Sequence, residues 1–212
     1  MTTSRGPALL ILTSAFLSAA ANGISMVAFP WLVLQRTGNA TDASVVAAAA
    51  TLPLLFATLV AGTAVDFLGR RRVAILADLM SATSVAAIPI LAATQGVGAL
   101  NTLVLAGLAA AGAFFDPGGM TARQSMLPEA AGRVGWTLDK TNSVYEAVFN
   151  LAYITGPGIG GLLIATIGGI NTMWVTAGSF GCSILTMALL PLPGAGRPAR
   201  TEHPEGVLSG GI

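Results

Sequence analysis

The sequence predicts an all-α integral membrane protein with six transmembrane helices. Charged residues make up only 9% of the 212 residues, whereas hydrophobic residues make up 54%. A soluble domain has about 25% charged residues. The mean hydropathy is +0.77. This is more apolar side chain than one water-exposed domain of this size can bury, so the predicted surroundings are a lipid bilayer.

The composition also excludes several classes of protein. A formal net charge of +1 argues against a nucleic-acid partner, which requires clustered Lys and Arg in excess. Cys182 is the single cysteine and His203 the single histidine, so neither an intrachain disulfide nor one of the commoner zinc sites is expected. The sequence has no Gly-xxxx-Gly-Lys-Ser/Thr loop, so it carries no ATPase of its own. We expect no enzyme activity, no metal and no cofactor.

Runs without charge predict the number of helices. No Asp, Glu, Lys or Arg occurs within 6–35, 43–65, 79–115 or 147–196. A spanning helix needs about 20 residues, so these runs hold one, one, two and two helices. Flexible or polar residues at 95–98 and 168–171 divide the two longer runs. The predicted spans lie near 8–34, 44–65, 73–94, 99–120, 141–165 and 171–192. They form one domain, 1–192, and we expect the Pro-, Gly- and charge-rich tail 193–212 to be disordered.

The positive charges predict the orientation, because short loops rich in Lys and Arg remain in the cytoplasm. If the N-terminus is inside, nine of the ten Lys and Arg residues are cytoplasmic and only Arg36 is outside. We therefore expect a multi-pass protein of the plasma (inner) membrane with both termini in the cytoplasm and an uncleaved first helix. The nine are Arg5, Arg70, Arg71, Arg72, Arg123, Arg133, Lys140, Arg197 and Arg200.

The loop between the second and third spans carries a recognisable motif. Gly62, Asp66, Gly69, Arg70 and Arg71 belong to a Gly-xxx-Asp-xx-Gly-Arg-Arg-Arg pattern. From charge alone, the arginines need do no more than hold the loop inside. The spacing, however, resembles the loop motif of the major facilitator superfamily, which lies after the second helix and acts as a conformational latch.

A second motif lies in the predicted fifth helix. Small residues recur there every four positions, which lets another helix approach closely, and a proline removes one backbone donor. A generic packing helix would show the same stripe. The Gly-Pro-xx-Gly-Gly context resembles the signature of proton-coupled drug antiporters in that superfamily. The motif residues are Ala152, Gly156, Pro157, Gly160 and Gly161.

The resemblance covers residues 8 to about 192 and extends to short stretches like those of macrolide-efflux-like exporters. It implies the N-terminal half of a twelve-helix transporter, itself built of two three-helix repeats, with substrate bound between the halves. The implied function is ion-coupled export of small amphipathic compounds by alternating access, together with a second six-helix half in a homodimer or on a separate chain. Two alternatives remain open: a truncated remnant or expressed fragment, and a non-transporting membrane subunit with a scaffolding role. The fourth-helix arginine motif of other drug antiporters is missing, which argues against proton coupling by that route.

Polar stripes mark the faces that avoid lipid. Ser14, Ser18, Asn22 and Ser25 share one face of the first helix. A second stripe lies on the fifth helix, turned away from its small-residue face. Serines often bond back to their own helix, so the amide and the acid carry more weight as functional candidates. The candidate pathway residues are Ser18, Asn22, Glu146, Asn150 and Tyr153.

Three acids lie in or near the spans, all in the predicted cytoplasmic halves: Asp78, Asp116 and Glu146. A structural charge network with the loop arginines and a proton-binding site are both compatible with this placement. We expect Asp116 to complete the latch with Asp66 and Arg70, with Asp78 as the other possible acid partner.

Overall fold

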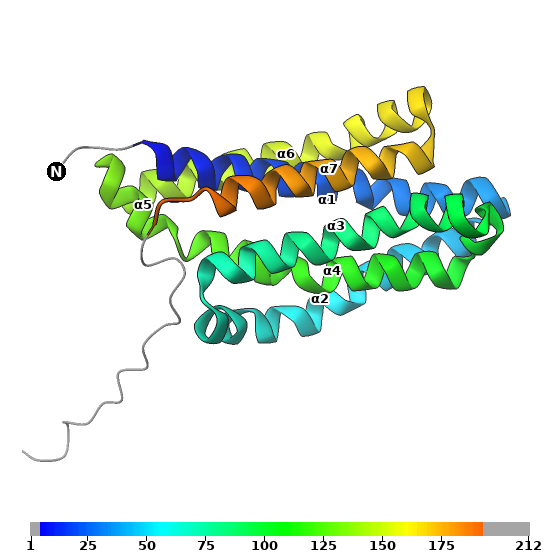
Figure 1. The fold of residues 1–212 in the computed structure, drawn as a ribbon, viewed down its shortest axis with the longest axis horizontal. Helices are drawn as coiled ribbons and strands as arrows, with labels where there is room; N and C mark the ends of the chain where they lie inside the picture. The colour runs from blue at the N-terminus through cyan, green and yellow to red at the C-terminus, as the bar shows by residue number, and fades with distance from the viewer. Residues whose placement is uncertain (1–4, 193–212) are drawn as a thin grey trace, which may run out of the picture.

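The computed structural model describes residues 5–192, which form six long helices and one short helix (Figure 1). No strand occurs within these residues, in agreement with the all-α prediction. The tail 193–212, including His203, lies outside the described residues. The elements are α1 (Gly6–Thr37), α2 (Ala40–Leu68), α3 (Arg70–Gln95), the 3-10 turn η1 (Val97–Ala99), α4 (Thr102–Gln124), α5 (Leu127–Val134), α6 (Leu138–Ile167) and α7 (Gly169–Ala188).

Local sequence explains where the structure differs from the predicted spans. Asn101 caps α4 by accepting a hydrogen bond from the Val104 backbone N–H, so the helix starts at Thr102 rather than near 99. The last helix ends at Ala188 rather than 192, because Pro191 disfavours helical backbone in the residue before it. The short helix α5 was not predicted.

Five segments of the described chain are long and apolar enough to cross a membrane: α1, α2, α3, α4 together with α5, and α6. The sixth long helix, α7, has 20 residues but is richer in hydroxyl side chains. It packs along both α1 and α3, which places it within the same bundle.

The long helices alternate in direction (Figure 1). The α1–α2, α3–α4 and α6–α7 connections lie at one end, which also carries Arg36 and which we call the Arg36 end. The start of α1, the α2–α3 turn and α5 lie at the other end, here called the α5 end. Gly69 makes the α2–α3 turn with a φ of 87°, a left-handed value that side chains disfavour.

The helices form two triplets that pack in a reciprocal manner. Helix α1 of the first triplet packs along α6 of the second, and α4 of the second packs along α2 of the first. In the same way, α3 packs on α4 while α7 packs on α1. This exchange of partners is the pattern of two three-helix repeats, as predicted.

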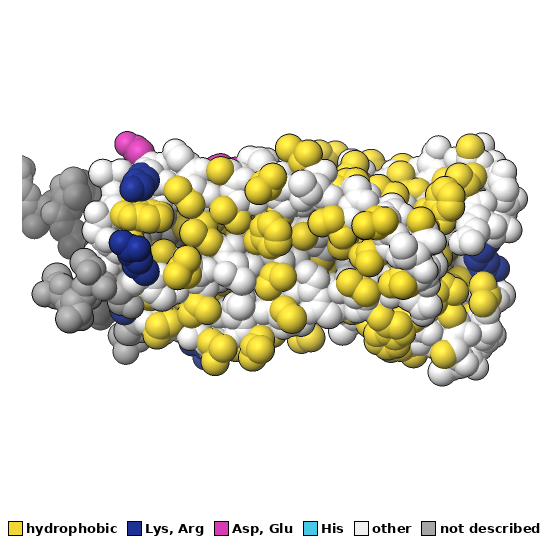
Figure 2. All heavy atoms as spheres, turned by 90° about the horizontal axis from the view of Figure 1, so that it is seen from above, with side chains coloured by type: hydrophobic (Ala, Val, Ile, Leu, Met, Phe, Trp, Pro, Cys, Tyr) yellow, Lys and Arg dark blue, Asp and Glu magenta, His cyan; other side chains and the backbone are white. Residues whose placement is uncertain are grey.

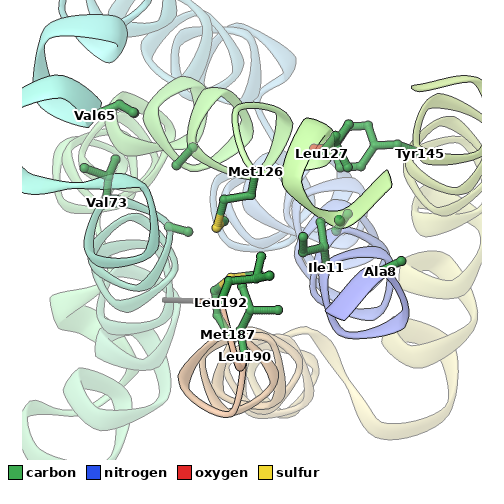
Figure 3. Close-up of a cluster of buried hydrophobic side chains, with 14 residues drawn as sticks. Ala8, Ile11, Val65, Val73, Met126, Leu127, Tyr145, Met187, Leu190 and Leu192 are labelled. Atoms are coloured by element: carbon green, nitrogen blue, oxygen red, sulfur yellow. The ribbon is translucent and has the colours of Figure 1, made fainter. Parts of the chain in front are cut away.

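Two apolar clusters fill the bundle, with polar residues between them. Ile11, Met126 and Met187 belong to the cluster at the α5 end, where Figure 3 shows the two methionines pointing toward one another. The other cluster extends toward the Arg36 end. Asp78 on α3 falls between Ala74 of the first cluster and Val85 of the second, so its carboxylate lies inside the bundle.

The surface is apolar along the length of the molecule. Figure 2 shows hydrophobic side chains over most of the long axis and Lys and Arg side chains near the two ends. On α2, Leu55, Phe56 and Leu59 are 67%, 67% and 78% exposed, far more than a water-facing helix carries side by side. Such a surface is suited to lipid or to another apolar helix.

Candidate functional site

A buried ion pair joins α3 to α4 inside the bundle, toward the α5 end. Asp78 and Arg123 are 2% and 3% exposed and form a salt bridge. The Asp78 carboxylate also accepts hydrogen bonds from Ser18 on α1, at 2.9 Å, and from Ser183 on α7, at 2.6 Å. Nε of Arg123 donates to Ser14 on α1 at 2.9 Å. We call these five residues the buried ion-pair network.

The buried ion-pair network connects both triplets. Its members come from α1 and α3 of the first triplet and from α4 and α7 of the second. Moving two charges out of water costs several kcal/mol per ion, and that cost is offset only if both are paired and their remaining hydrogen-bonding groups are satisfied. The three serines provide those extra partners here. The network therefore fixes how the two triplets sit against each other.

Asp116 does not join the loop arginines, contrary to the predicted latch. It lies about two turns, or about 10 Å, before Arg123 along α4. Its carboxylate accepts a hydrogen bond from Ser81 on α3 at 3.0 Å. Asn22 on α1 lies near the same carboxylate. Asp116 is thus too deep in the bundle to meet the α2–α3 turn, and Asp78, the other acid considered, pairs with Arg123 instead.

The loop arginines contact backbone carbonyls. Arg70 donates to the carbonyl of Ser125 at 2.9 Å, and Arg71 donates to that of Leu190 at 3.4 Å. Gly62 and Asp66 are exposed, and Asp66 forms no ion pair within residues 5–192. The motif therefore ties the α2–α3 turn to the ends of α4 and α7 while leaving Asp66 on the surface.

The candidate pathway residues differ in their exposure. Ser18 is buried in the ion-pair network, so it does not face a pathway. Asn22 is half-buried beside Asp116. On α6, Glu146 and Asn150 are exposed, and Tyr153 is 40% exposed with its hydroxyl 3.7 Å from Met26 Sδ of α1.

Glu146 lines a hollow at the α5 end. Its carboxylate accepts a hydrogen bond from the Gln124 amide at 3.0 Å. The hollow lies between the end of α4, α5 and the start of α6, and its lining residues are Gln124, Leu127, Pro128, Leu138, Asn142 and Glu146.

The small-residue motif of α6 is a packing face against α1. A Cβ added at Gly156 would lie 2.7 Å from the Cα of Gly23, so the two backbones touch. A Cβ at Gly160 would lie 3.2 Å from the Cα of Ile24. Gly161, by contrast, is exposed, and a Cβ added there would meet no other part of the structure within 4 Å. Ala152 is buried in the same contact, and Pro157 lies within the unbroken helix α6.

The role of Arg123 was not predicted. The predicted fourth span ended at 120, so Arg123 was interpreted only as a cytoplasmic charge. In the structure α4 continues to Gln124 and carries Arg123 into the bundle. The available signal was a pair of opposite charges, Asp78 and Arg123, which lie within about two turns of the same end of α3 and α4.

The architecture and the comparisons agree on the class of protein. A family model described as Major Facilitator Superfamily matches residues 11–209, and the chain belongs to that superfamily. It is a multi-pass membrane protein. The fold predicted from the two motifs is confirmed.

Two groups of relatives are more specific. The chain is 68% identical over 208 residues to the "Multidrug efflux pump Tap" of Mycolicibacterium fortuitum, covering 98% of this chain and 51% of that protein. It is 61% identical over 207 residues to proteins of the same description from Mycobacterium tuberculosis and Mycobacterium bovis, covering 98% of this chain and 49% of theirs. The chain spans about half the length of the curated relatives it matches.

Proposed function

We propose that this chain is the N-terminal half of an ion-coupled efflux permease that exports small amphipathic compounds by alternating access, with no enzymatic step. The observation that carries the proposal is the 68% identity, over 98% of the chain, to a protein described as a multidrug efflux pump. The rigid joining of two triplets by the buried ion-pair network supports it, because alternating access moves whole helix bundles against each other.

A second six-helix half completes the transporter, as a second copy of this chain or as a separate chain. Substrate in such transporters binds between the halves. Asn22, Glu146, Asn150 and Tyr153 are the partly or fully exposed polar residues of α1 and α6 that we assign to this interface. The alternatives are a truncated remnant and a scaffolding subunit, neither of which would move substrate.

The α2–α3 turn acts as the latch against that second half. Arg70 and Arg71 hold the turn to this half through two carbonyls, while the Asp66 carboxylate is exposed and available to a partner. This role differs from the latch expected within the half, because it needs no contact with Asp116.

An export assay tests the function. The chain, alone or co-expressed with the second half of the Mycolicibacterium fortuitum relative, is reconstituted into vesicles loaded with the amphipathic dye ethidium. We expect ethidium export only when two halves are assembled. Asp66→Asn should reduce that export more than Asp42→Asn does. Export by the single chain as a dimer would identify the homodimer. Inertness of every pairing would overturn the efflux proposal and favour a remnant or a scaffolding role.

Both termini lie in the cytoplasm in this proposal, with the protein in the inner membrane. Supporting this, the Lys and Arg residues within 5–192 lie at the α5 end, apart from Arg36. A cysteine introduced at Asn39 or Gly96 in a Cys182→Ser background should react with an impermeant reagent from outside. One at Arg133 should react only after permeabilisation, and the reverse pattern would refute the orientation.

A further inference from the structure

Asp116 is an acidic residue on α4 that forms no ion pair within residues 5–192. It is half-buried on α4, where it accepts a hydrogen bond from Ser81 and has Asn22 beside it. The charged groups near it are Asp78 on α3 and Arg123 on its own helix. Helix α1 contributes only the uncharged amide there.

Helix α2, which packs along α4, has its acids near its two ends. Asp42 lies in its first turn and Asp66 in its last. The interior of the bundle near Asp116 therefore holds two carboxylates and one guanidinium. Because Arg123 is already paired with Asp78, an ionised Asp116 leaves this interior with one uncompensated negative charge.

The Ser81 hydroxyl distinguishes two protonation states of Asp116. Its oxygen lies 3.0 Å from Oδ1 of Asp116 and 3.3 Å from the carbonyl oxygen of Gly112. A hydroxyl has one proton to donate, so it satisfies only one of these acceptors at a time. If Asp116 is protonated, it donates to Ser81, and Ser81 donates to Gly112. If Asp116 is ionised, Ser81 must turn toward it.

A second, independent observation concerns Tyr145 on α6. This side chain is fully buried, and its hydroxyl has no hydrogen-bond partner within residues 5–192. Figure 3 shows it directed from α6 toward Leu127. It lies close enough to Arg123 and to Glu146 for their charges to act on it. Buried hydroxyls of this kind are normally satisfied by water. The Tyr145 side chain is therefore an unsatisfied polar group close both to Glu146, which lines the hollow, and to Arg123 of the buried ion-pair network.

We propose that Asp116 is the carboxylate of this half that binds and releases a proton, with Ser81 as its hydroxyl relay. The inference rests on the proposed export function, because it assigns the residue that couples ion movement to that function. Binding moves one proton from water onto a carboxylate oxygen of Asp116 and turns the Ser81 hydroxyl to Gly112. Release returns the proton to water and turns the hydroxyl back. The Asp78–Arg123 pair keeps its charges in both states.

Infrared difference spectroscopy tests the assignment without transport. The purified chain in lipid is compared at alkaline and acidic pH, and the C=O stretch of protonated carboxyl groups is recorded. The spectrum of Asp116→Asn subtracted from that of the unchanged chain should contain one carboxyl band. Ser81→Ala should shift that band to higher frequency, because the carboxyl group loses its hydrogen-bond partner. Asp42→Asn, which removes an exposed acid, should leave the band in place.

Each result decides the proposal. A spectrum of Asp116→Asn identical to that of the unchanged chain, or a band that Ser81→Ala does not move, would overturn the site or the relay. If Asp116→Asn does not fold, as judged by circular dichroism, Asp116→Glu takes its place and must shift the band. The chain alone is measured, so the band can be present while the two-half assembly fails to export ethidium. That combination of results would refute the proposed efflux function and support the proton site at Asp116.

Discussion

Replacing Asp78 with asparagine keeps the size of the side chain but removes the carboxylate that pairs with Arg123. The guanidinium would stay in a position that is 3% exposed, with Ser14 and Ser183 as its remaining acceptors. The NH₂ group of the asparagine would also point at a hydrogen-bond donor, in the position where a carboxylate oxygen of Asp78 now accepts a hydrogen bond. Removing one partner of a buried ion pair costs about 3–5 kcal/mol, and we expect Asp78→Asn to lower the free energy of unfolding by that amount.

A matched control is available in the exposed pair Arg133–Glu129, whose side chains are 37% and 29% exposed at an N–O distance of 3.6 Å. Glu129→Gln should cost about 0.3–0.5 kcal/mol, since water screens the pair. The double variant Asp78→Asn/Arg123→Gln removes both buried charges. Its cost should therefore be smaller than the sum of the two single costs by about 1–3 kcal/mol.

The measurement is unfolding of the purified chain by sodium dodecyl sulfate in mixed micelles, followed by far-ultraviolet circular dichroism. Equal losses for Asp78→Asn and Glu129→Gln would refute the reasoning, because burial would then make no difference. Strict additivity in the double variant would refute it as well, since the two side chains would not be acting as a pair.

Three further predictions use the same unfolding measurement. Gly156→Ala should cost about 1–3 kcal/mol, because the added methyl would lie 2.7 Å from backbone of α1, while Gly161→Ala, with open space around it, should cost nothing; similar losses would mean that the helix contact is looser than described. Arg70→Gln should cost about 1 kcal/mol through the hydrogen bond to a carbonyl at 2.9 Å, and the exposed Arg72→Gln should be neutral; a reversed order would contradict this. Asp66→Asn should leave the stability of the isolated chain unchanged, because the carboxylate is exposed, and a loss above 1 kcal/mol would show a partner within this half.

The membrane class and the helical fold could be predicted because they depend on bulk properties. A charge inside a bilayer is costly wherever it points, so stretches without charge mark the helices regardless of how they pack. The end of the fourth helix was less accessible to this reasoning, because Asp116 already ends the charge-free run at 115 and Arg123 is the next charge after it. Both of these charged residues lie within α4, and the bundle buries Arg123.

Side-chain partners were harder to predict than helices. The small-residue face of α6 was visible as a four-residue repeat, whereas its contact at Gly23 was not, since a single glycine on α1 has no periodicity. The prediction that Asp116 pairs with a loop arginine was wrong for a related reason. Which acid meets which arginine depends on the depth and rotation of each helix, and Asp116 lies about two turns before Arg123 on α4.

The reciprocal packing of the triplets means that some helices are synthesised well before their main packing partners. Helix α2 leaves the ribosome and enters the bilayer before α4, its principal partner, has been synthesised. Only 17% of its most apolar stretch is buried even in the finished bundle. Helix α1 likewise waits for α6. Early in synthesis these helices must therefore be held by lipid or by the insertion machinery, and the bundle can close only once the last two helices have been delivered.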